Sequence, residues 1–500
     1  MPFNSLFAWI IKRRINHLDY FINNPVEIQE AVLNHLLESG KKTQFGSEHH
    51  MNTVSDYLSF SQKIPLSNYS DLEPYIQKEM QGIRNVLWPG KTKWFVKTSG
   101  TTSPFKYIPV TKESLLNCHY KGGKDLLSLY YNQLPKRKLY NAKHLILGGS
   151  AKLNPLGNNL FMGDLSAIII DNLPLWAELR RTPSKKTALL SDWEEKLEKM
   201  ALESINKNVC ILAGVPSWTL KLCHKVLEIS GKDNLREVWP NLELFMHGGI
   251  NFSPYKASFD KIISGPMNYF ETYNASEGFI GLQYQLNKPD LLLLLDYGIF
   301  YEFIPTNNYE GTKSSIIIDL KNVKVGVDYA IVLTTNSGLW RYILGDTIQF
   351  TNTNPFTFKI TGRVESYLNS VGEKLTVCQA EEAITYACQK TDCTLRDFTV
   401  GPFLNDEEVF TKHQWFIEFN TGPHSIENFT LFLDEKLQEL NSDYKVKRFN
   451  NLLLSEPLLK IVPENTFEKW LSSKNKVGGQ HKVPRLSSNR IILNEINDLL

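Results

Sequence analysis

The stretch KTSGTTSPFK, residues 97–106, sets hydroxyl side chains and one glycine between two lysines. Hydroxyls and backbone N–H groups of a glycine-containing turn can surround phosphate oxygens. Lys106 could then neutralise charge as a point cation. The stretch is no Walker A loop, because the chain's Gly-Lys-Thr at 90–92 has Asn85 where the first glycine should stand. Taken alone, such a cluster is more typical of an ordinary turn.

Two acidic residues follow predicted strands further along the chain. In TYNASEG (272–278), Glu277 could bind a Mg²⁺ ion that carries a nucleotide, or it could be a solvated loop glutamate. In WRYILGD (340–346), Asp346 could accept hydrogen bonds from both hydroxyls of a ribose. A Gly-Asp β-turn between strands is the alternative.

Three further segments carry basic residues beside glycines: GRVE (362–365), VGEK (371–374) and GGQHKVPR (478–485). Each is weak by itself. The adjacent His49 and His50 point apart in regular structure, which makes a metal site there improbable. The sequence contains no Gly-x-Ser-x-Gly elbow, His-Glu-x-x-His motif or EF-hand loop.

The composition is that of a globular protein able to bury a large core. Of the 500 residues, 42% are hydrophobic and 22% are charged, and the net charge of +2 gives no support to nucleic-acid binding. The N-terminal MPFNSLFAWIIKRR holds an apolar run of about seven residues, too short to span a bilayer. Six cysteines without a zinc-like spacing predict reduced, mostly buried thiols and a cytoplasmic protein.

The pattern of elements indicates how these candidates are positioned. Residues 1–45 have helical periodicity, and a turn-rich region follows at 60–90. From residue 94 to about 272, short apolar strands alternate with helices, which predicts an α/β sheet. Thr111 is predicted to cap one helix, Ser191 another as the start of a capping box, and Gly231 to end a third. Ligands in such sheets bind at loops after the strands.

Strands crowd together from about residue 290, and this predicts antiparallel pairing. The predicted strands lie at 291–295, 299–304, 314–319, 329–335 and 347–350. After Gly362, strands near 397–400 and 413–419 alternate with helices near 380–389 and 426–440. We therefore predict a large domain at 1–365 and a smaller α+β domain at 366–500.

The order of five segments makes the chain resemble a known family. These are TSGTT…KYIPVT (98–111), TYNASEG (272–278), WRYILGDTIQF (340–350), GRVESYLNSVGEKL (362–375) and QHKVPR (480–485). In this order they resemble the Gretchen Hagen auxin-responsive family of acyl acid amido synthetases, which belongs to the adenylate-forming superfamily. The phrase CHYKGGKDLL (118–127) is similar to bacterial members.

The resemblance implies a fold and a reaction. It implies the adenylate-forming fold, with a large N-terminal domain that includes a β-rich subdomain, and a mobile α+β C-terminal domain that rotates between half-reactions. Such an enzyme activates a carboxylic acid with ATP and Mg²⁺ to give an acyl-adenylate and pyrophosphate. An amine, often an amino acid, then attacks the acyl carbon. The resemblance leans towards a monomer.

The resemblance also implies roles for particular residues. Lys106, Lys374 and Lys482 would act on phosphate or adenylate, Glu277 would hold Mg²⁺, and Glu365 falls near the hinge. The residues implied around the nucleotide are Ser99, Gly100, Thr101, Thr102, Gly248, Gly249, Tyr273, Ser276, Asp346 and Arg363. No protein nucleophile is required, since lysines and Mg²⁺ offset the repulsion between carboxylate and triphosphate.

Some positions depart from the family pattern and leave alternatives open. The first loop is one residue short and carries Pro104, while Trp340 and His481 replace tyrosines. Transfer to coenzyme A would use the same first half-reaction. A non-catalytic adenylate-binding protein is the alternative from another class, although four retained polar residues, Lys106, Glu277, Asp346 and Lys482, argue against it.

Overall fold

The computed structural model describes most of the chain. The described residues are 14–98, 106–135, 139, 142–149, 153–364, 367–368, 370, 373, 375–403, 411–448, 453–474, 482–487 and 489–500. They divide into two compact units. Unit 1 comprises Met1–Val215, Leu222–Gly249 and Pro266–Lys359. Unit 2 comprises Ile360–Leu500 together with Pro216–Lys221 and Ile250–Gly265. The predicted boundary after residue 365 stays a prediction, because residues 365 and 366 lie outside the described ranges.

Unit 1 begins with helices, as predicted, and they continue further than predicted. The helices are α2 (Pro25–Gly40), α3 (Gln44–Glu48), α4 (Tyr57–Lys63) and α5 (Tyr69–Met80). The region 60–90, predicted as turns, thus contains most of α4 and all of α5. Asn68 caps α5 by accepting hydrogen bonds from two backbone N–H groups of its first turn, and Pro74 lies inside this helix. A strong N-cap therefore outweighs a proline that favoured a turn.

A four-stranded sheet contains Lys97, Thr98 and Lys106 of the stretch KTSGTTSPFK. Its order is β2-β1-β5-β4, with β1 (Trp94–Thr98), β2 (Lys106–Val110), β4 (Asn154–Gly157) and β5 (Leu160–Gly163). Thr111 caps the next turn of helix, as predicted, by accepting a hydrogen bond from the Ser114 N–H. The chain then passes through α6 (Lys112–Ser114), a short π-helix, η2 (Leu115–His119), and α7 (Tyr120–Gln133).

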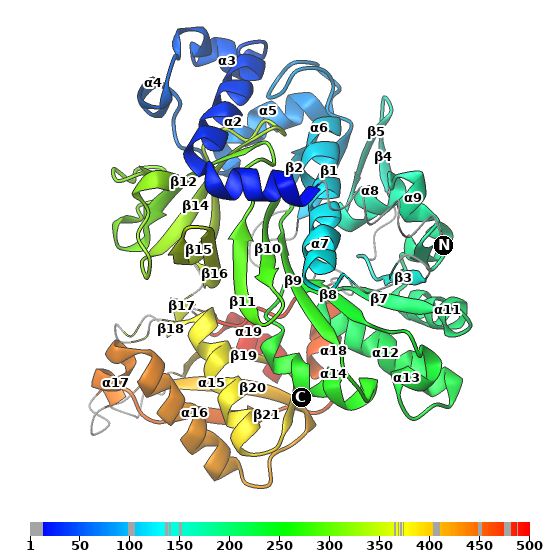
Figure 1. Ribbon diagram of the computed structural model, residues 1–500. Coiled ribbons are helices and arrows are strands. Elements are labelled where there is room, and N and C mark those ends of the chain that lie inside the picture. Colours follow the sequence, from blue (N-terminus) through cyan, green and yellow to red (C-terminus); the bar gives the residue numbers. More distant parts are fainter. Residues whose placement is uncertain are drawn as a thin grey trace. The chain divides into compact units, whose positions relative to one another are not determined.

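The second sheet of unit 1 is much larger and has twelve strands among the described residues (Figure 1). Its order is β13-β12-β14-β15-β16-β11-β10-β9-β8-β7-β3-β6. The strand bounds are β3 (Lys143–Ile146), β6 (Arg181–Thr182), β7 (Val209–Gly214), β8 (Leu244–Gly248), β9 (Asn268–Asn274), β10 (Phe279–Gln285), β11 (Lys288–Leu293), β12 (Ile299–Pro305), β13 (Ile318–Asp319), β14 (Asp328–Thr335), β15 (Tyr342–Thr353) and β16 (Phe356–Arg363).

This sheet is parallel at one end and antiparallel at the other. Strands β6, β3, β7, β8 and β9 pair in parallel, which confirms the predicted α/β half. Antiparallel pairing begins at β9 and β10, earlier than predicted. The strand predicted at 314–319 shortens to the two residues of β13. Both halves therefore belong to one continuous sheet.

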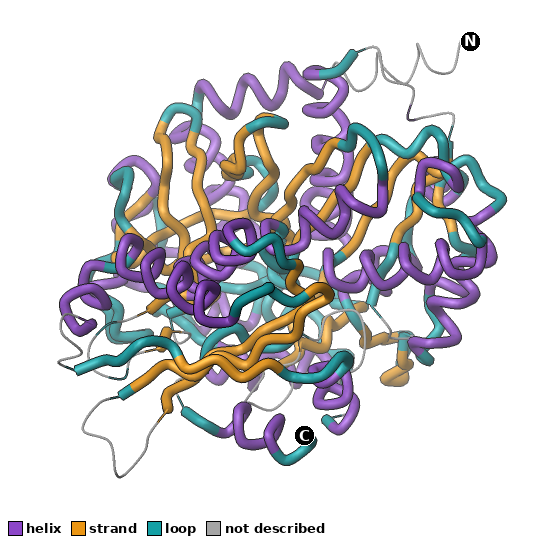
Figure 2. The backbone as a smooth tube through the Cα atoms, turned by 90° about the horizontal axis from the view of Figure 1, so that it is seen from below, coloured by secondary structure: helices purple, strands orange, loops and turns teal. Residues whose placement is uncertain are grey.

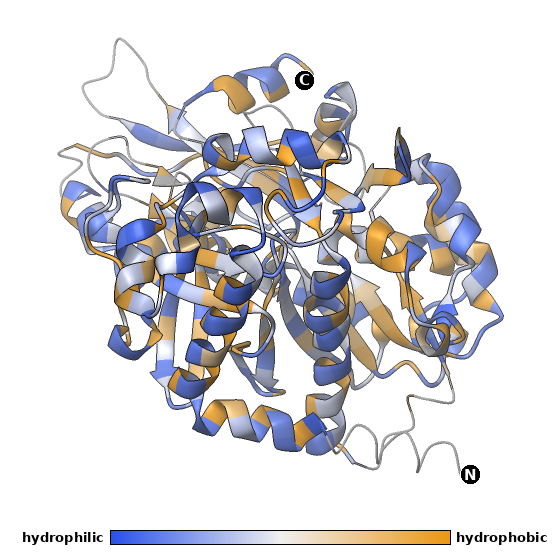
Figure 3. Ribbon diagram, turned by 90° about the horizontal axis from the view of Figure 1, so that it is seen from above, coloured by the Kyte–Doolittle hydropathy of each residue, from blue (hydrophilic) through white to orange (hydrophobic). Residues whose placement is uncertain are grey.

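Helices connect the parallel strands, and two of their predicted ends can be compared with the structure. The connecting helices include α8 (Leu165–Asp171), α9 (Leu175–Glu178), α10 (Lys185–Ala188), α11 (Trp193–Ile205), α12 (Pro216–Ser230), α13 (Leu235–Val238) and α14 (Ser253–Ile263). The cap of α11 is Asp192, which accepts from the Glu195 N–H, so the prediction of Ser191 was wrong by one residue. Gly231 ends α12 in the left-handed conformation, as predicted. Hydrophobic and hydrophilic residues alternate along the helices (Figure 3).

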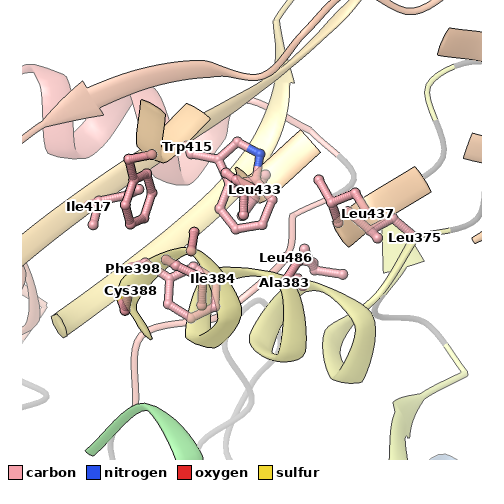
Figure 4. Close-up of a cluster of buried hydrophobic side chains, with 14 of the residues drawn as sticks. Leu375, Ala383, Ile384, Cys388, Phe398, Trp415, Ile417, Leu433, Leu437 and Leu486 are labelled. Atoms are coloured by element: carbon pink, nitrogen blue, oxygen red, sulfur yellow. The ribbon is translucent and has the colours of Figure 1, made fainter. Parts of the chain in front are cut away.

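Unit 2 is an α+β layer structure. Strands β19 (Thr394–Phe403), β20 (Lys412–Thr421) and β21 (Leu458–Ile461) form a sheet (Figure 2). The short strand β17 (Tyr367–Leu368) pairs with β18 (Leu375–Thr376). Its helices include α15 (Val377–Lys390), α16 (Ile426–Leu440), α17 (Ser442–Arg448), α18 (Thr466–Ser473) and α19 (Ile491–Asn497). Side chains of α15, α16 and the strands form its core (Figure 4).

Two global expectations can also be compared with the structure. All six cysteines are free thiols, and five of them are buried, as predicted. In the part of the chain that the structure describes, no helix is long and apolar enough to cross a membrane.

Candidate nucleotide-binding site

A hydrogen bond joins two of the residues that were predicted to bind the nucleotide. The Tyr273 hydroxyl, on β9, donates to Oδ2 of Asp346, on β15, over 2.5 Å. The Tyr273 ring also packs edge-on against Phe358, with 6.2 Å between ring centroids. Two motifs that are 73 residues apart in sequence therefore meet in unit 1.

A β-bulge positions Asp346. Ile343 pairs with Val332 and Thr347 pairs with Ala330, so three residues of β15, Leu344 to Asp346, stand opposite Ile331. Gly345 lies at φ +87°, a conformation that favours glycine. The alternative of a simple Gly-Asp turn was wrong, because Gly345 and Asp346 lie within a strand. Bulges of this kind reorient a side chain beside a functional site.

The arginine of the same motif has a structural task. The Arg341 guanidinium is 2% exposed and makes a two-point ion pair with Glu302, at 2.8 Å for both contacts. It also donates to the carbonyl oxygens of Ser61 and Ile64. Its backbone is left-handed, at φ +45°, which costs free energy for a residue with a Cβ. Arg341 therefore fixes the strand that leads to Asp346.

Gly248 ends β8 at the edge where the parallel strands finish. It lies opposite Thr272 in the parallel register, and a Cβ at Gly248 would come 2.3 Å from the Thr272 carbonyl oxygen. Gly249 follows at φ +85°. Only glycine fits both positions, so the backbone itself forms this edge beside Tyr273.

Ser276 and Glu277 lie in the turn between β9 and β10. Ala275 and Gly278 close this turn by exchanging two backbone hydrogen bonds, at 2.9 and 3.3 Å. Ser276 and Glu277 are half-buried. Glu277 is thus held on a tight hairpin turn, three residues after Asn274 at the end of β9.

Lys106 is the first residue of β2 and pairs with Thr98 of β1. Its Nζ lies 5.8 Å from the centroid of the Tyr69 ring. The Tyr69 hydroxyl accepts a hydrogen bond from the Tyr107 N–H, and Ser67 pairs with Tyr342 of β15. A short segment thus links the strand of Lys106 to the strand of Asp346. The predicted phosphate contacts Ser99, Gly100, Thr101 and Thr102 lie outside the described residues.

Unit 2 carries Arg363 and Lys482, both exposed. Arg363 is the last residue of β16. Lys482 precedes a segment that pairs with β19, where the Val400 N–H donates to the Arg485 carbonyl oxygen over 2.9 Å. The Arg485 guanidinium is bonded to Asp397 and to the Tyr255 hydroxyl. Three residues after Lys482, the chain is therefore firmly fixed.

The predicted Lys374 and Glu365 lie outside the described residues, but the residue before Lys374 is described. The Glu373 carboxylate is fully buried and lies 2.8 Å from the His413 ring. It accepts from the Ser370 N–H, and its backbone carbonyl accepts from the Asn441 side chain.

Two residues that no sequence pattern predicted hold the Glu277 turn. His119 Nδ1 lies 2.9 Å from Oδ1 of Asn274, before the turn. After it, the Phe279 N–H donates to the Cys118 sulfur over 3.1 Å. Both residues belong to the CHYKGG phrase, yet helical periodicity cannot reveal the π-helix that brings them together.

Comparison with known proteins gives the identity of the fold and family. The GH3 family N-terminal domain model matches residues 14–267, the central domain model 292–363 and the C-terminal domain model 378–491. The chain belongs to the GH3 family. It is 22% identical to the indole-3-acetic acid-amido synthetase GH3.4 of Arabidopsis thaliana, over 95% of this chain and 92% of that protein.

Other members of the GH3 family have a comparable sequence identity to this chain. The 4-substituted benzoates-glutamate ligase GH3.12 of Arabidopsis thaliana is 21% identical, over 93% of each chain. Among solved structures, the GH3.15 acyl acid amido synthetase superposes with a TM-score of 0.77 at 20% identity, over 97% of this chain and 96% of that one. A 2-hydroxyisobutyryl-CoA ligase superposes with a TM-score of 0.57 at 12% identity, over 94% and 91%. The fold is that of adenylate-forming enzymes, as predicted.

Proposed function

We propose that this GH3 protein is an ATP-dependent acyl acid ligase. It converts a carboxylic acid to its acyl-adenylate and then transfers the acyl group to an amine to form an amide. The proposed amine is an amino acid. The observation that carries the proposal is the hydrogen bond between Tyr273 and Asp346, which joins two of the five ordered segments. Tyr273 lies on β9, next to the strand β8 that ends at Gly248. The names of the GH3 relatives support the reaction class.

The residues of unit 1 suit a nucleotide. Asp346 would accept hydrogen bonds from the ribose hydroxyls, and the Tyr273 hydroxyl holds this carboxylate in one orientation. The edge formed by Gly248 and Gly249 offers backbone without side chains, against which adenine could lie. Lys106 would contact the phosphates, together with the loop 99–102.

The described acidic residues fit Mg²⁺ that arrives with ATP. Within the described ranges, no three His, Cys, Asp or Glu side chains cluster as a metal site. Mg²⁺ often takes only one or two protein carboxylates and fills its shell with phosphate oxygens and water. Glu277, on a fixed turn, would be that carboxylate. The ion would neutralise charge on the departing pyrophosphate.

The basic residues of unit 2 would complete the chemistry. Lys374 and Lys482 would stabilise the negative charge that develops during adenylation, and Arg363 would lie near the nucleotide. Ser276 would contact the nucleotide beside Glu277. Preformed cations of this kind need no reorganisation at the moment of reaction. We also propose a monomeric, cytoplasmic enzyme, in keeping with buried thiols and family resemblance.

Acid-dependent exchange of pyrophosphate into ATP tests the adenylation step. The purified protein is incubated with a panel of aryl, indole and fatty acids, and at least one acid should support exchange. If folded protein exchanges pyrophosphate with none of them, the proposal is wrong. Mass spectrometry of products formed with amino acids or with coenzyme A then distinguishes amide from thioester formation.

A further inference from the structure

A buried histidine supports the turn that carries Glu277. His119 is 5% exposed and lies at the end of the π-helix η2. Its Nδ1 is 2.9 Å from Oδ1 of Asn274. Because this amide oxygen can only accept, Nδ1 carries the proton. Burial lowers the pKa of His119 to about 4, so the ring is neutral at physiological pH.

The other end of the turn is held by the neighbouring residue. The buried Cys118 sulfur accepts from the Phe279 N–H, and burial raises the pKa of this thiol to about 12. Cys118 and His119 therefore hold the last residue of β9 and the first residue of β10. The turn with Glu277 spans the four residues between these two contacts.

Close packing makes this arrangement specific. A Cβ at Gly122 would lie 2.3 Å from the ring of Phe279, and a Cβ at Gly278 would lie 2.5 Å from Ile299. In Figure 1, α7 runs alongside β9 and β10. The turn therefore has little room to adopt another position if its hydrogen bonds are kept.

The π-helix explains how consecutive residues reach both ends. The widened turn contains one more residue than an α-helical turn, and such insertions occur frequently at functional sites. The same stretch begins at β2, whose first residue is Lys106, and continues through the Thr111 cap. One continuous segment, residues 106–119, thus contributes Lys106 and supports the turn of Glu277.

We infer that His119 is a positioning residue in the binding of Mg²⁺-bound ATP. It acts by holding the Glu277 turn through its contact with Asn274. The inference rests on the proposed function, since Glu277 is the proposed Mg²⁺ ligand. His119 itself contacts neither nucleotide nor metal in this scheme.

Equilibrium binding of a non-hydrolysable ATP analogue, measured by calorimetry with and without Mg²⁺, tests the inference. His119→Leu removes the hydrogen bond between the buried histidine and the half-buried Asn274 side chain. It should weaken analogue binding in the presence of Mg²⁺ by about tenfold and leave binding without Mg²⁺ unchanged. His119→Asn keeps a donor near the Nδ1 position and should recover most of this loss. His144→Leu is the control, because His144 is a half-buried histidine on β3, and burial also lowers its pKa to about 4.

Asn274→Ala removes the same contact by changing its other partner, which is half-buried. This variant takes the place of His119→Leu in the experiment if His119→Leu does not fold. Wild-type Mg²⁺ dependence in either folded variant overturns the inference, as does an equal loss in His144→Leu. The proposed function fails separately: the wild-type protein would then bind the analogue with Mg²⁺ yet show no acid-dependent pyrophosphate exchange. A wild-type protein that does not bind the analogue overturns both.

Discussion

The Tyr273 hydroxyl and the Asp346 carboxylate are 2.5 Å apart, on strands β9 and β15 of one sheet. Three strands, β10, β11 and β16, lie between them in the strand order. Asp346 makes this contact from the bulge at Leu344 to Asp346, where the regular pairing of β15 with β14 is broken. A site assembled in this way depends on how well each of the two strands is fixed.

Tyr273→Phe should raise KM for ATP in pyrophosphate exchange by about tenfold, because a hydrogen bond to a carboxylate is lost. The kcat should change little, since the hydroxyl orients the nucleotide site and leaves the reacting phosphate untouched. Tyr284→Phe, on β10, is the control. An unchanged or lower KM in Tyr273→Phe would mean that this hydroxyl competes with the ribose instead of orienting Asp346.

Lys482→Ala should lower kcat by ~10²–10³-fold and largely retain ATP binding, because a cation that acts on developing charge is removed. Single-turnover adenylation and calorimetric ATP binding measure the two effects. Lys474→Ala is a suitable control, since Lys474 is an exposed lysine paired with Glu495 in the same unit. Normal turnover of Lys482→Ala would remove this lysine from the site.

Arg341→Met should cost about 3–5 kcal/mol of unfolding free energy, because it leaves Glu302 as a buried, unpaired charge. Urea denaturation measures the loss, and Lys199→Met, which breaks an exposed pair with Glu195, should leave the midpoint unchanged. A stable Arg341→Met protein that has lost ATP binding would contradict the structural role and place Arg341 in the nucleotide site.

Local patterns predicted most elements and several of the site positions. Strand–helix alternation placed β7, β8 and β9, and glycine chemistry placed the end of α12. The resemblance named Tyr273 and Asp346 separately. Their hydrogen bond could not be predicted, because it depends on a bulge that follows from pairing between β14 and β15.

Long-range burial accounts for what was missed. Arg341 lies in a recognised motif, but its partner Glu302 is 39 residues away and on another strand. The histidines gave no signal in the sequence, and only the register of the π-helix against β9 and β10 makes His119 stand out. Pro74 misled the prediction at α5, where the Asn68 cap decides the conformation.

Glu79 should make the stability of the protein fall as pH rises. Burial raises the pKa of this carboxyl to about 7, against hydrogen bonds from the Leu87 N–H and Thr92 that favour the charged form. Its folded pKa lies above the unfolded value, so the folded state binds the proton more tightly. The stabilisation is present below about pH 4.5 and is lost as pH rises through about 7, by about 3 kcal/mol in total.

Glu79→Gln removes this titration and isolates the effect. Urea unfolding of both proteins at pH 5 and pH 8 gives the difference in unfolding free energy at each pH. The unfolding free energy of the variant minus that of the wild-type protein should be about 2–3 kcal/mol larger at pH 8 than at pH 5. The reason is that only the wild-type protein must ionise a buried carboxyl as the pH rises. If the two proteins differ in unfolding free energy by the same amount at both pH values, Glu79 has an ordinary pKa in the folded protein. Water would then reach this carboxyl beside Leu87.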